Sequence, residues 1–221
     1  MRYDVKVFLA GVSTNIHSTD GSMMKVIEQQ RPFLLESFAY VNRYTDDLIR
    51  YSSDFILDSG AFTYIYKAKG KAQGAKIDWE EYARRYADYI VSRKIEKYIE
   101  LDIDSLIGYD GVLKLRKTLE KLTGRPCMPV WHTSRGRQDF EDTCRRYRYF
   151  AIGGLTVFKK DWSLLKPFIH EAHRHGCRIH GLGFTKTSML NEMPWDSVDS
   201  SSWSSGGRYG FIYKFDGEKL I

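Results

Sequence analysis

The sequence repeats one pattern along most of its length, in which a short apolar run rich in β-forming residues precedes a segment with apolar residues three or four positions apart. The predicted strands are 5–10, 55–57, 98–103, 128–131, 149–152, 178–182, 197–199 and 211–215. The predicted helices are 32–41, 78–93, 112–122, 139–147, 163–175 and 188–193. Asp78 is a plausible N-cap of the second helix, and Gly176 is expected to end the fifth. The alternation predicts an α/β fold with a parallel sheet, either open and doubly wound or closed as a (β/α)8 barrel.

The length of 221 residues is near the lower limit for such a barrel, so some helices must be short or missing. No linker, low-complexity tract or internal repeat divides the chain, and a single domain over residues 1–221 is expected. In either architecture, ligands bind at the carboxyl ends of the parallel strands. Polar residues that directly follow a predicted strand are therefore the candidates for a functional site.

The composition indicates a globular protein with a basic surface. Aromatic residues make up 14% of the chain, which excludes a disordered polypeptide, and no apolar run is long enough to span a bilayer. The 34 Lys and Arg exceed the 28 Asp and Glu, giving a net charge of +6 that suits a polyanionic partner such as nucleic acid. Three widely spaced cysteines form neither a disulfide framework nor a zinc motif, and no signal peptide is evident. We expect a cytoplasmic protein with no membrane partner.

Acidic residues follow two of the predicted strands. Asp58 follows an apolar strand and precedes Ser59 and Gly60, which suits either a carboxylate at the mouth of the strand or a helix N-cap. Glu100, Asp102 and Asp104 alternate with apolar residues, which would place all three acids on one side of a strand. Because three acids are costly to bury unpaired, they should line a polar interior, bind Mg²⁺ or Mn²⁺, or pair with arginines in a structural network.

Three further segments place polar residues or glycines at strand ends. His132 follows a predicted strand, where a histidine serves structure as readily as function. Gly153 and Gly154 end the next strand and would let a flat ligand or a phosphate lie against the backbone, although glycine pairs are also common in turns. Asp199 lies on a short strand before a loop rich in Ser and Gly, where it could act as a nucleophile or a base. In a closed barrel, Asp58 and Asp199 would meet across the mouth, as glycosidic chemistry requires of two carboxylates.

Taken in order, five motifs resemble the landmarks of the queuine/archaeosine tRNA-guanine transglycosylase superfamily. They are LDSGAF, LDIDS, VWHTSRG to AIGGL, GLGFT and WDSVDSSSW, and they extend over about residues 55–208. Members of this family are (β/α)8 barrels that exchange a guanine base for a 7-deazaguanine without cleaving the nucleic-acid backbone. The resemblance therefore implies a compact barrel and a glycosyltransferase of the pentosyltransferase type.

The resemblance also implies roles for individual residues. Asp199 resembles the nucleophile, with Asp196 as the preceding acid of its motif, and Asp58 resembles the acid/base that also recognises the base. Asp104 or Asp102 resembles the aspartate that reads the purine edge.

Base and backbone contacts follow from the same resemblance. His132 falls where the family usually has a glutamine that binds the base, and Gly153 and Gly154 resemble the platform beneath the base. From their positions, Phe62 or Trp203 would stack on the base, with Ser59 beside Asp58. The residues expected to hold phosphates are Arg135, Arg137 and Arg208, for each of which a solvated surface charge is the alternative.

Two departures from the family pattern favour DNA over tRNA. The zinc cluster that follows the nucleophile is missing, because the chain has no cysteine after Cys177, and Gly-Phe-Gln is replaced by Ala61-Phe62-Thr63. A compact, zinc-free barrel resembles the phage and bacterial enzymes that insert 7-deazaguanines into DNA. We expect DNA and a free 7-deazaguanine such as preQ0 as substrates, no metal, no cofactor, and the host cytoplasm if the chain is phage-encoded. Accessory modification proteins are candidate partners, and the sequence leaves the oligomeric state open.

The expected reaction is a double displacement through a covalent intermediate. Asp199 attacks C1′ of a deoxyguanosine after the nucleotide has left the stack, and a 7-deazaguanine that has lost its N9 proton to Asp58, or to a water it holds, then displaces Asp199. The alternatives are a tRNA transglycosylase and a catalytically inactive module that binds nucleic-acid bases. A metal-dependent barrel hydrolase using Glu100, Asp102 and Asp104 is a third.

Overall fold

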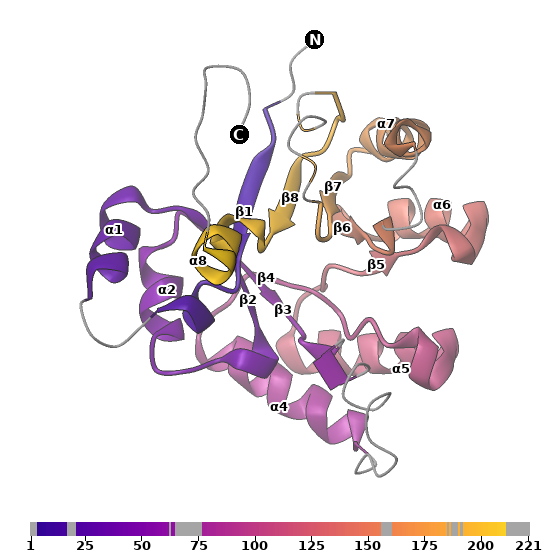
Figure 1. Cartoon of the computed structure of the whole chain (residues 1–221). Helices are drawn as coiled ribbons and strands as arrows, with labels where there is room; N and C mark the ends of the chain where they lie inside the picture. The colour runs from indigo at the N-terminus through magenta and orange to yellow at the C-terminus, as the bar shows by residue number, and fades with distance from the viewer. Residues whose placement is uncertain are drawn as a thin grey trace. The chain divides into compact units, whose positions relative to one another are not determined.

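The computed structural model describes residues 4–16, 21–61, 63–64, 77–155, 161–184, 186, 190 and 192–210. The predicted strand 211–215, residues 188, 189 and 191 of the predicted helix 188–193, Phe62, and the side chain of Arg208 lie outside the described residues. The chain divides into two compact units (Figure 1). The first unit comprises Met1–Gly11 and Trp131–Ile221, and the second unit comprises Val12–Val130. In the part of the chain that the structure describes, no helix is both long and apolar enough to cross a membrane.

The first unit is built on a parallel sheet. Its strands are β1 (Lys6–Ala10), β6 (Tyr149–Ile152), β7 (Arg178–Gly181) and β8 (Ser197–Ser200). β1 pairs with β8, β8 with β7 and β7 with β6, all in parallel. Trp131, the last residue of β5 (Val130–Trp131), accepts a hydrogen bond from the amide of Gly153 at 3.0 Å. The helices are η3 (Thr133–Arg135), α6 (Gly136–Arg146), η5 (Trp162–Leu165), α7 (Lys166–Arg174), η7 (Ser202–Ser204) and α8 (Ser205–Tyr209).

The two faces of this sheet differ in polarity. Phe150, Ile179 and Val198 are fully buried and belong to one apolar cluster. The other members of that cluster include Phe140 of α6 and Ile169 of α7, so these helices cover the apolar face. Because side chains alternate along a strand, the residues between the apolar ones lie on the opposite face. That opposite face is polar and carries the candidate site.

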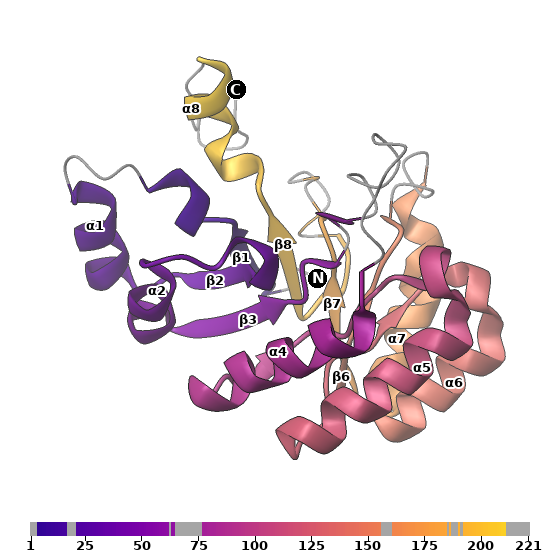
Figure 2. The same cartoon turned by 90° about the horizontal axis from the view of Figure 1, so that it is seen from below.

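In its described residues, the second unit holds three parallel strands and the longer helices. The elements described there are η1 (Ser13–Asn15), α1 (Ser22–Gln30), β2 (Phe33–Ser37), η2 (Phe38–Tyr40), α2 (Thr45–Tyr51), β3 (Asp54–Asp58), α4 (Trp79–Ser92), β4 (Lys97–Tyr98) and α5 (Asp104–Thr123). β3 pairs with β2 and with β4. α4 and α5 lie side by side (Figure 2) and bury Tyr86, Ile90, Leu115 and Leu119 in a second apolar cluster.

Most predicted elements are confirmed, with the expected caps. α4 begins after Asp78, whose Oδ1 accepts hydrogen bonds from the amides of Glu80 and Glu81, both at 3.0 Å. Gly176 follows α7 with φ of 71°, the left-handed conformation that glycine adopts most readily. The prediction of an α/β fold of parallel strands and helices is confirmed. The closed barrel and the single domain stay predictions.

Two predicted elements were wrong. The helix predicted over 32–41 is instead β2 followed by η2, because Leu34, Leu35 and Glu36 are all buried. A strand buried on both faces forms a continuous apolar run, which periodicity alone does not distinguish from a helix. The strand predicted over 98–103 ends at Tyr98, and Asp104 already begins α5.

Candidate active site

Asp199, the third residue of β8, presents an oriented carboxylate near the end of that strand. Its side-chain Oδ1 accepts hydrogen bonds from the amide of Gly183 at 2.7 Å and from Nε2 of His180 at 3.2 Å. The residue is 8% exposed. Among the described residues no hydrogen bond reaches Oδ2, so this second oxygen is the one available to a reacting atom.

The partner of Asp199, His180, is a functional residue that sequence reasoning missed. It is fully buried in β7, directly opposite Ser197 in the pairing of β7 with β8. Its Nδ1 lies 2.7 Å from Ser197 Oγ, which in turn is hydrogen-bonded to the hydroxyl of Tyr149. The signal that could have found it is the period-two alternation of β7, which places His180 on the face opposite Ile179. Within the first unit, a continuous polar chain thus leads to Asp199.

Glycines of the first unit form a backbone surface beside His132. Gly154 has φ of 64°, and a Cβ there would lie 2.9 Å from His132 Nδ1. The imidazole of His132 therefore lies against the bare backbone at the carboxyl end of β6. Gly153 continues the strand ladder through its bond to Trp131. The structure thus brings together His132 and Gly154, two residues that the sequence indicated as base contacts.

We expect Gly154→Ala to destabilise the first unit and displace the His132 ring. A side chain at positive φ costs about 1–2 kcal/mol, and the new methyl group would also collide with Nδ1. Gly124→Ala is the matched control, because Gly124 has φ of 70° and no atom within 4 Å of the added Cβ. Urea unfolding should show a larger loss for Gly154→Ala, and the NMR signals of His132 should shift in that variant alone. Equal losses and an unshifted His132 would contradict the contact.

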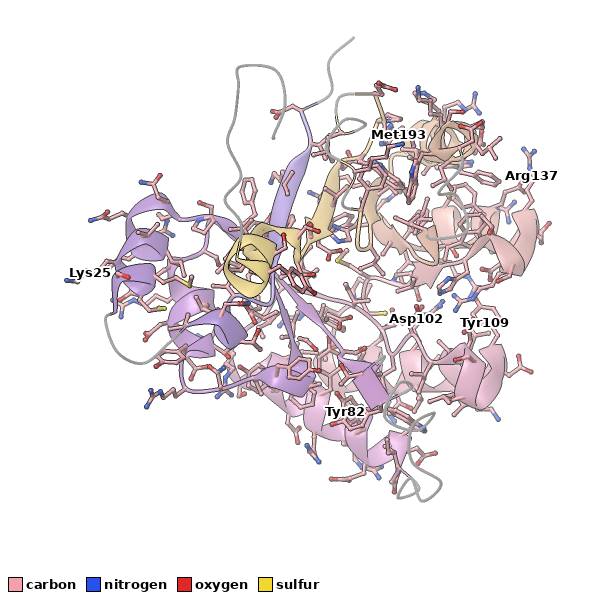
Figure 3. All side chains as sticks on the ribbon, viewed as in Figure 1. Lys25, Tyr82, Asp102, Tyr109, Arg137 and Met193 are labelled. Atoms are coloured by element: carbon pink, nitrogen blue, oxygen red, sulfur yellow. The ribbon has the colours of Figure 1, made fainter. Side chains whose placement is uncertain are left out.

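The expected phosphate and stacking residues have varied surroundings. Arg137 projects from the outside of α6, with its side chain 78% exposed and 2.9 Å from Glu141 (Figure 3). This matches the alternative of a solvated surface charge. Arg135 is partly buried at the end of η3. The indole of Trp203 donates a hydrogen bond to the carbonyl of Ala10 at 3.0 Å, which ties η7 to the end of β1.

The preceding acid of the same motif has a structural role. Asp196 Oδ2 accepts a hydrogen bond from the amide of Ile179 at 2.7 Å and lies 2.8 Å from His173 Nε2. Asp196 directly precedes β8, whereas Asp199 lies further along the strand, toward its carboxyl end. The structure therefore separates the roles of the two acids in Asp-Ser-Val-Asp.

In the second unit, Asp58 ends β3 in a tightly constrained turn. Its Oδ2 accepts a hydrogen bond from the amide of Gly60 at 2.9 Å. Gly60 has φ of 69°, and a Cβ there would lie 2.5 Å from Ser37 Oγ, so only glycine fits. The hydroxyl of Tyr82 donates to the carbonyl of Ser59 at 2.6 Å. These contacts fix the turn that follows β3 and orient the carboxylate of Asp58.

A second buried phenol fixes the strand that carries Asp58. Tyr86 donates its hydroxyl hydrogen toward the carbonyls of Leu57 and Ile99, at 2.8 and 3.0 Å. Burial raises the pKa of Tyr86 well above its usual range, and the nearby carboxylate of Asp58 raises it further. The phenol therefore stays neutral and remains a donor at physiological pH, which keeps the end of β3 in place.

The three acids Glu100, Asp102 and Asp104 do not share one face of a strand. Glu100 is fully buried and forms a bidentate ion pair with Arg116, at 2.6 and 3.0 Å. Its Oε1 also accepts a hydrogen bond from the amide of Val130 at 2.7 Å. Asp104 begins α5, and Asp102, labelled in Figure 3, is partly buried before it. The prediction of one acidic strand face was wrong, and for Glu100 the structural alternative of an arginine pair holds.

Comparison with known proteins leaves the family open. No known family model matches the sequence, and no curated protein matches it. One solved structure of similar fold is the carboxyl transferase domain of Rhizobium etli pyruvate carboxylase with 3-bromopyruvate, at 10% identity and a TM-score of 0.49. The match covers 88% of this chain but only 39% of that chain. A likeness this distant says nothing about the activity of the chain.

The chemistry available in each unit follows from these contacts. The first unit presents the oriented carboxylate of Asp199, and it also brings His132 against the backbone at Gly154. The second unit presents the carboxylate of Asp58 at the end of β3. An oriented carboxylate with one oxygen available is suited to nucleophilic attack or to proton transfer.

Proposed function

We propose that the chain is a DNA-modifying guanine transglycosylase, which replaces guanine in DNA with a 7-deazaguanine base. The proposal includes a (β/α)8 barrel as the complete fold. The observation that carries it is the carboxylate of Asp199, held through Oδ1 by Gly183 and His180. A carboxylate restrained in this way presents Oδ2 in a fixed direction, which lowers the entropic cost of attack on a bound sugar.

In the first half of the reaction, Asp199 Oδ2 forms a bond to C1′ while the bond from C1′ to N9 of guanine breaks. The electron pair of that bond leaves with guanine, whose N9 takes up one proton from solvent; the incoming base releases one proton in the second half, so the exchange is balanced. In the second half, the incoming 7-deazaguanine gives its N9 proton to Asp58 or to a water that Asp58 holds. N9 then bonds to C1′, and the bond from C1′ to Asp199 breaks, which restores the carboxylate.

Two features support the substrate assignment. The net charge of +6 suits a nucleic acid. Within the 221 residues no cysteine follows Asp199, whereas a zinc cluster with three cysteines follows the nucleophile in the tRNA enzymes that the motifs resemble.

Base exchange tests the proposal directly. The protein is incubated with radiolabelled guanine or preQ0 and, separately, with duplex DNA, single-stranded DNA and tRNA. We expect label to enter DNA. Label in tRNA alone would move the assignment to a tRNA transglycosylase, and binding of bases without exchange would favour the inactive module. Activity that EDTA abolishes would instead favour a metal-dependent hydrolase.

A further inference from the structure

We propose that His180 is a positioning residue for the nucleophile, with its Nε2–H directed at Asp199 and its Nδ1 bonded to a buried chain of hydroxyls from Ser197 and Tyr149. The catalytic meaning of this inference rests on the proposed function. The chain consists of the Tyr149 hydroxyl, Ser197 Oγ, the imidazole of His180 and Asp199 Oδ1. Its members come from three neighbouring strands, β6, β7 and β8.

The direction of the hydrogen bonds follows from the acceptor at one end. An ionised carboxylate only accepts, so His180 Nε2 must carry the hydrogen that points to Asp199 Oδ1. In the neutral imidazole, Nδ1 is then an acceptor and Ser197 donates to it at 2.7 Å. The Ser197 oxygen in turn accepts from the hydroxyl of Tyr149. Every donor thus points toward Asp199, and each polar atom of the chain has a partner.

Burial makes this arrangement consequential. His180 is 0% and Ser197 is 1% exposed, so a wrongly placed proton would leave two lone pairs facing each other in a site with little water. In the opposite tautomer, Nε2 would direct a lone pair at Oδ1 and push the carboxylate away. The carboxylate of Asp199 therefore selects the Nε2–H tautomer, and the hydroxyls of Ser197 and Tyr149, each of which can donate or accept, satisfy Nδ1.

Packing fixes the plane of the imidazole as well. The rings of Phe8 and Tyr149 meet His180 edge to face, with ring centroids at 5.9 and 6.5 Å. The amide of Gly183 donates to the same oxygen of Asp199 as Nε2 does. Two donors on Oδ1 restrict rotation of the carboxylate and leave Oδ2 as the attacking atom. His180 thus orients the nucleophile without touching the substrate.

Two substitutions of His180 test whether it acts by donating a hydrogen bond to Asp199. They distinguish this role from simply filling space and from transferring a proton. In His180→Gln, the side-chain amide can donate a hydrogen bond from nearly the position of Nε2, whereas His180→Leu fills the space without a donor. We expect His180→Leu to lower kcat for base exchange on the order of 10²-fold with KM nearly unchanged. His180→Gln should recover most of this loss. His170→Leu is the matched control, because His170 is exposed on α7, and it should leave kcat unchanged.

Long-range ¹H–¹⁵N NMR of the wild-type protein at neutral pH gives a readout independent of activity. We expect the Nε2–H tautomer of His180, and a loss of that preference in Asp199→Ala, which removes the acceptor of Nε2–H. An Nδ1–H tautomer in the wild type would overturn the proposal, as would equal kcat losses in the Gln and Leu variants. If NMR shows the expected tautomer but the assay shows no base exchange, the orientation of Asp199 by His180 stands. Only the proposed function would then be contradicted.

Discussion

Asp199→Asn should abolish base exchange while leaving the fold intact. The asparagine carbonyl oxygen can still accept the hydrogen bonds that Gly183 and His180 now donate to Oδ1. The amide nitrogen that replaces Oδ2 has no lone pair suited to attack C1′, so no glycosyl-enzyme forms. We expect the rate to fall by at least about 10³-fold, as for other enzymes that lose a covalent nucleophile. The measurement is the rate of label transfer, together with trapping of the protein–DNA adduct on a denaturing gel.

Asp142→Asn provides the matched control for that variant. The substitution makes the same chemical change as Asp199→Asn, on α6 of the same unit. The side chain of Asp142 is 46% exposed and pairs with Arg145. An exposed pair contributes little to stability, so this variant should retain both wild-type exchange and the adduct. Adduct formation by Asp199→Asn at the wild-type rate would exclude Asp199 as the nucleophile and leave Asp58 as the next carboxylate to test.

The sequence was sufficient to predict a strand and its candidate residue where all the signals lie within a few consecutive residues. β8 was predicted from the apolar residue between Ser197 and Asp199, and the acid at its end was identified as a candidate for the same reason. Gly153 and Gly154 were also found from their place after an apolar run. In these cases the alternation of a strand and the residue that follows it are both visible in a few consecutive letters.

Signals that depend on pairing between distant segments were not visible in the sequence. His180 lies 19 residues before the carboxylate it contacts, and only the register of β7 against β8 places them on one face. A histidine one position before a glycine gives no local indication of that register. β2 was missed for a related reason, since the burial of Glu36 beside Leu35 hides the alternation of a strand.

The acidic segment after β4 shows where local alternation misleads. Glu100 and Asp104 are spaced as on one strand face, yet the second of them belongs to a helix. The sequence offered metal binding and arginine pairing as alternatives, and nothing local favours Arg116, 16 residues further along. Tertiary packing decides between metal binding and arginine pairing, because it brings the guanidinium of Arg116 on α5 against the carboxylate of Glu100.

The ion pair between Glu100 and Arg116 predicts the largest effect on stability. Both side chains are nearly inaccessible, at 0% and 7% exposed. Glu100→Ala would leave the guanidinium buried without its carboxylate and the amide of Val130 without its acceptor. Breaking a buried pair from one side costs about 3–5 kcal/mol, which corresponds to a fall in Tm of roughly 6–20 °C for a chain of this size.

Urea and thermal unfolding of three variants test this prediction. Glu81→Ala, which removes an exposed partner of Arg84 on α4, should cost no more than about 1 kcal/mol. The double variant Glu100→Met/Arg116→Met leaves no charge buried, so it should recover much of the stability that Glu100→Ala loses. If Glu100→Ala were as mild as Glu81→Ala, the carboxylate of Glu100 would not be committed to Arg116. The carboxylate would then be available as a ligand for a divalent cation. That result would favour the alternative of a metal-dependent hydrolase.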